Sequence, residues 1–279
     1  MTTTLTSPDL TKQVAPAPIP DVSNHISLKK TAQNSLTMAY RGLLKIRHNP
    51  EQLFDVTVQP ILFTALFAYI FGGSIGGSVS GYLPLLIPGI LVQTVVLTSV
   101  ATGTQLREDM DKGVFDRFKS LPIARISALA GALLADMVRY GLATTLTVIV
   151  GLALGYRPEG GVLGVVAAGL VVVFCSFAIS WIWALVGVTG KSAASVQGIS
   201  MMIMFPLTFM GGTFAPVDKM PGWLQGINKA NPIYYMCNTA RELMNGTGVT
   251  ANLAWSLIGG VVVIIVFAPL ALRAYMRHA

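Results

Sequence analysis

The chain has 279 residues, of which 53% are hydrophobic and only 11% are charged, whereas soluble domains carry about 25% charged residues. This composition excludes an ordinary soluble enzyme and indicates an integral membrane protein. The formal net charge of +7 would also suit a nucleic-acid-binding protein. However, the basic residues do not gather on polar, aromatic-rich segments, so no nucleic acid is expected as a partner.

The N-terminal part of the chain is polar. Residues 1–27 are rich in Thr, Ser and Pro and lack an apolar run, so we expect a disordered cytoplasmic tail without a cleavable signal peptide. The rest, residues 28–279, is expected to form one membrane domain. Its first helix is predicted over Gln33–His48, where apolar and basic side chains fall on opposite faces. This pattern favours an amphipathic helix at the membrane surface, although a solvated helix packed on the protein's own core fits it too.

Six apolar segments follow, and each is long enough to cross a bilayer, which takes about 20 residues of helix. We therefore predict an all-α integral membrane protein with six transmembrane helices. A Gly/Ser-rich linker, Gly72–Gly81, is expected between the first two. The spans are placed near residues 56–73, 83–105, 128–154, 161–188, 195–215 and 252–272.

The distribution of Lys and Arg predicts the orientation. With the N-terminus inside, 14 of the 19 basic residues lie on the cytoplasmic side and four lie outside, while Arg139 lies within a span. Because positive charge stays on the cytoplasmic side, both termini are predicted to be cytoplasmic.

The loop after the second span, Leu106–Arg125, holds nine charged residues of both signs in twenty positions. An apolar stripe through Met110 and Phe118 predicts a short amphipathic helix, which ends at Leu121–Pro122. The basic residues of this loop alone would set the orientation of the protein in the membrane, because acidic residues contribute little to that orientation. The four acids therefore indicate a protein partner recognised by charge complementarity, while a solvated helix satisfied by its own ion pairs remains the alternative.

Two motifs carry a family resemblance. The charged loop supplies one set, and the segment Phe205–Gly246 supplies the second, with Pro in the fifth span followed by "PGWLQ", "NP", Arg and Gly. The chain resembles the permeases of type-2 ABC exporters, and within them the daunorubicin/doxorubicin resistance drug exporters. The matching residues are Arg107, Glu108, Gly113, Arg117, Ser120, Leu121 and Pro122 in the first set, and Pro206, Pro221, Trp223, Leu224, Gln225, Asn231, Pro232, Arg241 and Gly246 in the second.

The resemblance implies a half-transporter in the bacterial cytoplasmic membrane. It would pair with a second copy of itself and bind two separate ATP-binding subunits, which would hold ATP and Mg, so this chain would carry no cofactor. Gln33–His48 would correspond to the family's connecting helix and Leu106–Pro122 to its coupling helix. The residues expected to couple to the ATPase are Arg107, Glu108, Asp109, Met110, Gly113, Arg117 and Phe118.

The chain itself is not expected to be an enzyme. Gly190–Ser192 reads "GKS", but Leu185 stands where a phosphate-binding loop requires its first glycine. The three histidines lie near the chain ends, and the two cysteines have no metal-like spacing. No catalytic residue and no metal ligand are predicted.

Residues 216–251 are too polar to span the bilayer but contain a helix signature. Asn231 suits an N-cap, Pro232 the first helical position and Gly246 the C-terminal stop. The resemblance implies short extracellular re-entrant helices that help to close the exit, with Trp223, Asn231, Pro232 and Arg241 as the extracellular gate. An ordinary extracellular loop is the alternative.

The predicted substrate path follows the fifth span, whose soft and aromatic side chains suit varied flat hydrophobic molecules. Met201, Met204, Phe205 and Phe209 are the candidates, with Gln93 of the second span as a polar one. Contact with lipid or with a second copy explains these side chains as well. Asp136 and Arg139 of the third span suit either a mutual ion pair or an anion site.

The function predicted from these features is ATP-driven export of hydrophobic drugs, such as anthracycline-like compounds. Export of a lipid or polysaccharide is the alternative within the class. An ion-coupled secondary transporter using Asp136, or a membrane scaffold, would belong to a different class.

Overall fold

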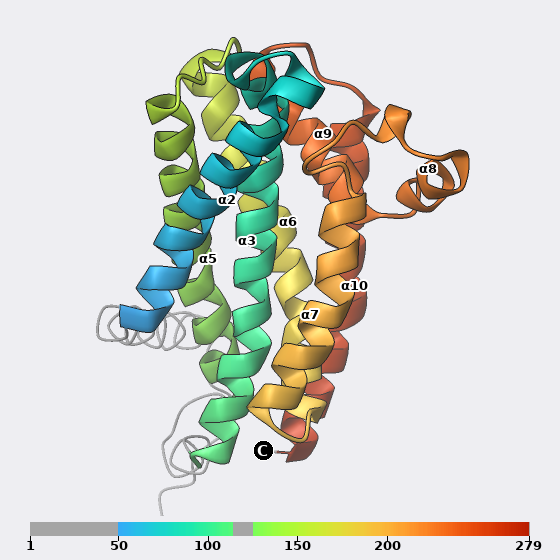
Figure 1. The fold of residues 1–279 in the computed structure, drawn as a ribbon. Coiled ribbons are helices and arrows are strands. Elements are labelled where there is room, and N and C mark those ends of the chain that lie inside the picture. The colour runs from blue at the N-terminus through green and yellow to red at the C-terminus, as the bar shows by residue number, and fades with distance from the viewer. Residues whose placement is uncertain (1–49, 114–124, 279) are drawn as a thin grey trace, which may run out of the picture.

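The computed structural model describes residues 50–113 and 125–278, which form helices and connecting turns (Figure 1). The tail and the predicted helix Gln33–His48 lie outside these residues. The helices are α2 (Pro50–Gly76), α3 (Val79–Asp111), α5 (Arg125–Ala153), α6 (Gly161–Thr189), α7 (Ala193–Met210), the short 3-10 helix η1 (Val217–Lys219), α8 (Gly222–Asn228), α9 (Pro232–Asn245) and α10 (Ala251–His278).

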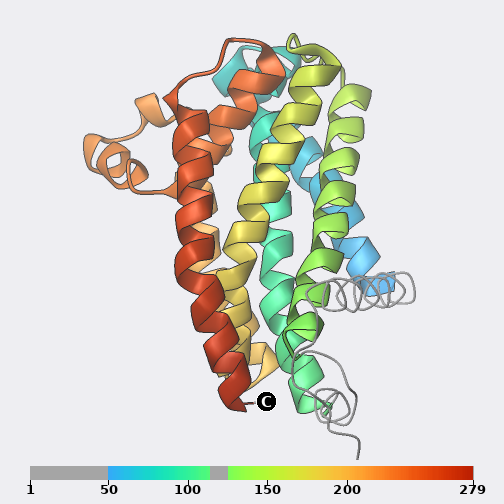
Figure 2. The same cartoon turned by 180° about the vertical axis from the view of Figure 1, so that it is seen from behind.

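Six of these helices, α2, α3, α5, α6, α7 and α10, are long and apolar enough to cross a membrane. The six predicted spans are thereby confirmed as helices, but the fifth, predicted over 195–215, ends at Met210, because Gly211 caps α7 and Gly212 turns the chain with a φ of +82°. The bundle has two ends, which we name by their residues (Figures 1 and 2). The charged end is formed by the C-terminal ends of α3 (Asp111) and α10 (His278) and by the start of α7 (Ala193), and the opposite end, which contains α9 (Pro232–Asn245), is the α9 end.

The linker predicted over Gly72–Gly81 is wrong in extent, because helix continues through Gly76 and resumes at Val79. Gly77 reverses the chain with a φ of +70°, a conformation that suits glycine. Gly76 lets the two helices meet, since a Cβ atom there would lie 2.5 Å from the backbone nitrogen of Tyr82. The glycines of this segment therefore allow α2 and α3 to pack closely as a helical hairpin, and they do not form a flexible linker.

Helix α3 is the centre of the bundle, and α2, α5, α6, α7 and α9 all pack against it (Figures 1 and 2). In its most apolar window 83% of the residues are buried inside the protein, against 11% for α10. Helix α10 is therefore mostly at the surface of the bundle, while α3 is enclosed by the other helices.

The α3–α6 contact depends on two glycines. A Cβ atom at Gly103 would lie 2.4 Å from the carbonyl oxygen of Trp183, and one at Gly187 would lie 2.4 Å from the carbonyl oxygen of Gly103. Small residues that allow backbones to approach are a main source of helix association in membranes, where lipid is as apolar as leucine.

We expect Gly103→Ala to lower the free energy of unfolding by about 1–3 kcal/mol, because the added methyl group meets backbone atoms that cannot rotate away. Gly141→Ala is the matched control, since a Cβ atom there has no heavy atom within 4 Å. Thermal unfolding of the purified proteins in detergent measures both. Equal melting temperatures for the two variants would contradict the close α3–α6 contact.

Candidate functional site

The charged end of α3 extends beyond the predicted span. The second span was predicted to stop at residue 105, but α3 continues to Asp111, and Gly113 follows with a φ of +64°. This left-handed glycine ends the helix, as the Gly113 amide donates to the carbonyl of Met110 at 3.0 Å. The first part of the predicted coupling helix is thus a continuation of α3, whereas Arg117 and Phe118 lie outside the described residues.

Two ion pairs organise the charges on this part of α3. The Arg107 guanidinium lies 2.5 Å from the Asp111 carboxylate, and the Lys112 ammonium lies 3.3 Å from Glu108. Both are pairs four residues apart with exposed members, a type worth about 0.3–0.5 kcal/mol. Their contribution to stability is therefore small. Asp109 and Met110, the other predicted coupling residues here, are partly buried.

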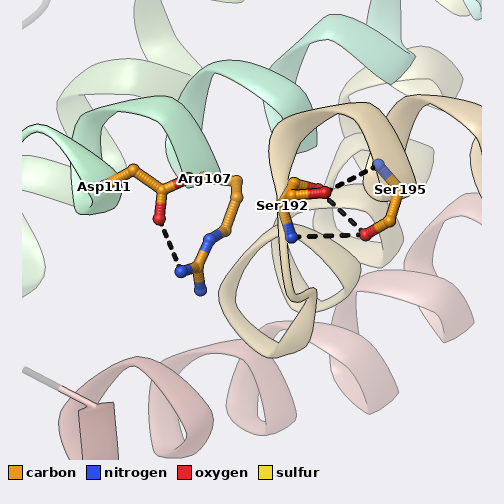
Figure 3. Close-up of polar contacts among 4 residues, drawn as sticks. All are labelled: Arg107, Asp111, Ser192 and Ser195. Carbon is orange, nitrogen blue, oxygen red and sulfur yellow. Dashed lines mark hydrogen bonds and ion pairs between the residues drawn. The ribbon is translucent and has the colours of Figure 1, made fainter.

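The start of α7 lies beside this end of α3 (Figure 3). The Thr104 hydroxyl donates to the Gln197 amide oxygen at 2.8 Å, which joins the two helices. Ser192 and Ser195 form a reciprocal capping box at the first turn of α7. The "GKS" segment is therefore a turn and helix cap between α6 and α7. Sequence reasoning missed this cap, although the spacing of the two serines was a usable signal.

The predicted helix at the opposite end is confirmed as α9. The Asn231 side chain accepts the amide hydrogen of Ile233 at 3.0 Å, Pro232 occupies the first turn, and Gly246 ends the helix with a φ of +67°. The Asn231 amide nitrogen also donates to the carbonyl of Leu207 near the end of α7, at 2.8 Å.

Arg241 connects α9 to two other segments. Its Nε donates to the carbonyl of Leu85 on α3 at 3.2 Å, and its Nη2 donates to the carbonyls of Gly212 and Thr213, the latter also at 3.2 Å. Burial lowers the pKa of Arg241, but a guanidinium stays protonated at physiological pH. A cation thus lies at the C-terminal end of α7, where the helix dipole favours positive charge.

A proline explains why α3 offers a further carbonyl to α9. Pro88 has no amide hydrogen, so the carbonyl of Pro84, four residues earlier, has no partner within the helix. The side-chain amide of Asn245 donates to this carbonyl at 2.9 Å. Nearby, the Tyr82 hydroxyl donates to the carbonyl of Phe214 at 2.6 Å. These bonds tie the α9 end of α3 to α9 and to the turn after α7.

The structure does not gather the four predicted gate residues into one cluster. Asn231 and Arg241 both bond to carbonyls at or just after the end of α7. Trp223 lies on α8, which projects to the side of the bundle, and its side chain is 69% exposed (Figures 1 and 2). Pro232 is exposed at the start of α9.

The candidate path residues of α7 differ in exposure. Met204 is buried, Met201 and Phe209 are partly buried, and Phe205 is exposed. Phe205 and Phe209 stack with ring centroids 4.4 Å apart. They form one end of a row of six phenyl rings that runs from α7 through the turn at Phe214 to α2. In order, the row is Phe205, Phe209, Phe214, Phe67, with Phe63 and Phe71 both stacked on Phe67.

Sequence reasoning missed the part of this row outside α7. Phe63, Phe67 and Phe71 recur every four residues, which places them on one face of α2 and was a signal in the sequence. The contact between Phe67 and Phe214, with centroids 3.9 Å apart, joins positions distant in sequence and had no such signal.

Gln93 of α3 is buried, at 2% exposure, and neither atom of its side-chain amide has a hydrogen-bond partner among the described residues. Its position relative to Gly89 and Thr104 places all three on one face of α3. That face meets the α7 side, because Gly89 lies against the backbone of Thr213 and Thr104 bonds Gln197. An unpaired amide therefore lies between α3 and α7 within the membrane-spanning region.

Asp136 and Arg139 form a buried ion pair at 2.9 Å. The second Asp136 oxygen accepts a hydrogen bond from the Thr102 hydroxyl at 2.5 Å, so the pair also ties α5 to α3. The mutual ion pair is thus the arrangement present. Among the residues that the structure describes, no group of three or more His, Cys, Asp or Glu side chains is placed to hold a metal ion.

Comparison with known proteins agrees with this architecture. The ABC-2 type transporter family model matches residues 33–245. The daunorubicin resistance ABC transporter permease protein DrrB1 of Streptomyces coeruleorubidus is 43% identical over 241 residues, which cover 86% of this chain and 85% of that protein. The probable doxorubicin resistance ABC transporter permease protein DrrC of Mycobacterium tuberculosis is 25% identical over 62% of this chain and 63% of its own length. With six helices able to span a membrane and a family match across most of its length, the chain belongs to the ABC-2 type transporter family as a multi-pass permease subunit.

Proposed function

We propose that this chain is the membrane subunit of an ATP-driven exporter of hydrophobic drugs of the anthracycline type. The observation that carries the proposal is the 43% identity to a daunorubicin resistance permease over most of both chains. The charged end would face the cytoplasm of a bacterial cell, so that both termini are cytoplasmic, as the excess of Lys and Arg on that side supports. The α9 end would then face outward, with α8 and α9 as short re-entrant helices.

The charged end of α3 is proposed to dock on a separate ATP-binding subunit. Arg107, Glu108, Asp111 and Lys112 present both signs of charge at a helix end, and their ion pairs add little stability. A patterned surface of this kind is suited to recognition by charge complementarity. Two ATP-binding subunits would supply ATP and Mg, and two copies of this chain would complete the exporter.

The substrate path is proposed to follow the side of the bundle where α2 and α7 flank α3 (Figure 1). The row of six phenyl rings offers flat faces for stacking with planar aromatic molecules. Gln93 would offer a buried amide that has no hydrogen-bond partner among the described residues. Asn231 and Arg241 would close the outer end of the path by holding the turn after α7 against α3 and α9.

Drug accumulation in bacterial cells tests the function. Cells that express this chain together with its ATP-binding subunit should accumulate less daunorubicin than cells that express either subunit alone. An ATPase variant unable to hydrolyse ATP is the control and should restore accumulation. Unchanged accumulation with both subunits assembled in the membrane would overturn the proposal.

We expect Gln93→Leu to raise thermal stability while it lowers drug export. The substitution removes a buried amide without partners, whose desolvation costs about 1–3 kcal/mol, but it also removes the proposed polar contact with the drug. Gln197→Leu is the matched control, because that amide is bonded to Thr104 and its loss should lower stability. Normal export by the Gln93→Leu protein would exclude a role for this amide in the path.

A further inference from the structure

A cavity of about 190 Å³ lies between α6, α7, α9 and α10, and none of the six phenyl rings of the row is in its lining. Its lining on α6 extends from Cys175 to Val186, which is about 16 Å of helix at 1.5 Å per residue. On α7 it includes Ile203 and Met204, and on α10 it reaches from Trp255 to Val263. The cavity is thus long and narrow, with its length parallel to the helices.

The walls are almost entirely apolar, and the few polar groups there already have partners. The Cys175 thiol donates to the carbonyl of Ser256 at 3.5 Å, and the Ser256 hydroxyl pairs with Thr239 at 3.1 Å. The indole N–H of Trp183 is the exception, since it has no partner among the described residues. An apolar cavity of this kind does not hold water but accepts hydrocarbon, since a 150 Å³ apolar cavity already binds benzene.

The size of the cavity decides between two kinds of hydrophobic ligand. Sites for whole drug-sized molecules occupy about 300–1,000 Å³, which exceeds the space here. A single hydrocarbon chain needs length and little width, and this cavity has that shape. Two of the helices that line the cavity, α7 and α10, also have exposed lining residues, since Ile203 is 46% and Trp255 is 58% exposed. A lipid chain could therefore enter from the outer surface of the bundle.

Groups of the kind expected at a lipid headgroup lie near the α9 end of the cavity. Trp255 stands one turn into α10, and its ring lies 6.3 Å from that of Tyr235. The Tyr235 hydroxyl donates to the backbone carbonyl of Lys229 at 2.8 Å, and Lys229 precedes the cavity-lining Pro232 by three residues. Lys229 is exposed and forms no ion pair with the described residues. Paired aromatic rings and an exposed lysine near the α9 end of an apolar cavity complement the ester region and the phosphate of an anionic lipid.

We propose that this cavity binds one acyl chain of an anionic phospholipid, whose headgroup lies beside Lys229. The lipid would fill the space between α7 and α10 and so support the position of α7, a wall of the proposed drug path. The site adjoins that path at α7, where the candidate path residue Met204 also lines the cavity, but it does not depend on which substrate is exported.

Quenching of Trp183 fluorescence by brominated lipid tests the proposal. The full chain, with Trp181, Trp223 and Trp255 replaced by Phe so that an aromatic ring remains beside Tyr235, would be reconstituted into vesicles that contain phosphatidylglycerol or phosphatidylcholine with the same dibrominated chains. We expect half-maximal quenching at about fivefold less phosphatidylglycerol than phosphatidylcholine, which corresponds to one lysine near the headgroup. Lys229→Gln should abolish this preference, whereas Lys191→Gln, at the charged end, should preserve it.

Filling the cavity provides the second arm. A Cβ atom at Gly259, in the lining, and one at Gly141, on α5, would each have no heavy atom within 4 Å. Gly259→Leu should abolish the quenching of Trp183, Gly259→Ala should reduce it in part, and Gly141→Leu should leave it unchanged. Quenching that survives Gly259→Leu would overturn the acyl-chain site. Absence of quenching in the parent protein would do the same and would point to a second copy or a drug molecule as the occupant. Equal quenching by the two lipids would overturn the anionic headgroup.

Discussion

Arg241→Ala is expected to destabilise the protein by about 3 kcal/mol or more and to abolish export, because three carbonyls lose a charged donor. These carbonyls belong to Leu85, Gly212 and Thr213, so one substitution weakens both the α3–α9 and the α7–α9 connection. Thermal unfolding of the purified protein and drug accumulation in cells would measure the two effects. Arg241→Lys should give an intermediate result, since an ammonium group cannot reproduce the fork of the guanidinium.

Arg157→Ala is the matched control for Arg241. Arg157 also lies at the α9 end and also bonds to carbonyls, those of Leu152 and Tyr156, but it is exposed. Its loss should change the free energy of unfolding by less than about 0.5 kcal/mol. If the Arg241→Ala protein unfolded and exported like the Arg157→Ala protein, Arg241 would have no structural role at this end.

Glu108→Lys is expected to reduce association with the ATP-binding subunit by more than about tenfold while it changes the stability of this chain by less than about 1 kcal/mol. The substitution breaks an exposed pair with Lys112, whose own contribution is small, but it reverses a charge on the proposed docking surface. Co-purification of the two subunits measures association. Glu159→Lys makes the same charge change at the α9 end and should leave association unchanged.

A charge swap distinguishes docking from a purely internal role. In the double variant Glu108→Lys with Lys112→Glu, the ion pair within α3 is kept and only its direction is reversed. If the partner subunit recognises the charges, the double variant should associate as poorly as Glu108→Lys alone. Recovery of association and export in the double variant would mean that the pair acts only within α3.

The sequence predicted the six spans and α9 well because both rest on local signals. Apolar length identifies a membrane helix, and Asn231, Pro232 and Gly246 mark the boundaries of α9 through backbone preferences of single residues. The extent of α3 was underestimated, because charge at Arg107 ends a hydrophobic span without ending a helix. The linker after α2 was overestimated, because Gly and Ser read as flexible where they allow close packing.

Hydropathy did not predict which helix lies at the centre of the bundle. Helix α6 has the highest mean hydropathy, 2.7, yet only 39% of its window is buried, whereas α3 has 2.0 and is 83% buried. In a bilayer an apolar side chain is equally satisfied by lipid and by protein, so hydropathy does not rank helices by burial. The better signal was the set of small and polar residues along α3, among them Gly89, Gly103 and Gln93.

The candidate site was predicted as residues but not as contacts. Asn231 and Arg241 were identified through a family motif, but their partners are backbone carbonyls at or near the end of α7, which carry no sequence signature. The row of phenyl rings becomes continuous only when folding brings Phe67 and Phe214 together. Contacts of this kind depend on tertiary structure, so the local sequence pattern does not predict them.

The course of α3 from one end of the bundle to the other has a mechanical consequence. Between Pro88 and Asp111 this helix contains no proline, so about 35 Å of it is a stiff rod, while Pro84 and Pro88 weaken its other end. A tilt of the rod by about 5° displaces one end relative to the other by about 3 Å, a distance as large as a hydrogen bond. Because Arg241 and Asn245 bond to the carbonyls of Leu85 and Pro84 at the proline-containing end of α3, a tilt of the rod at the charged end would act on these bonds.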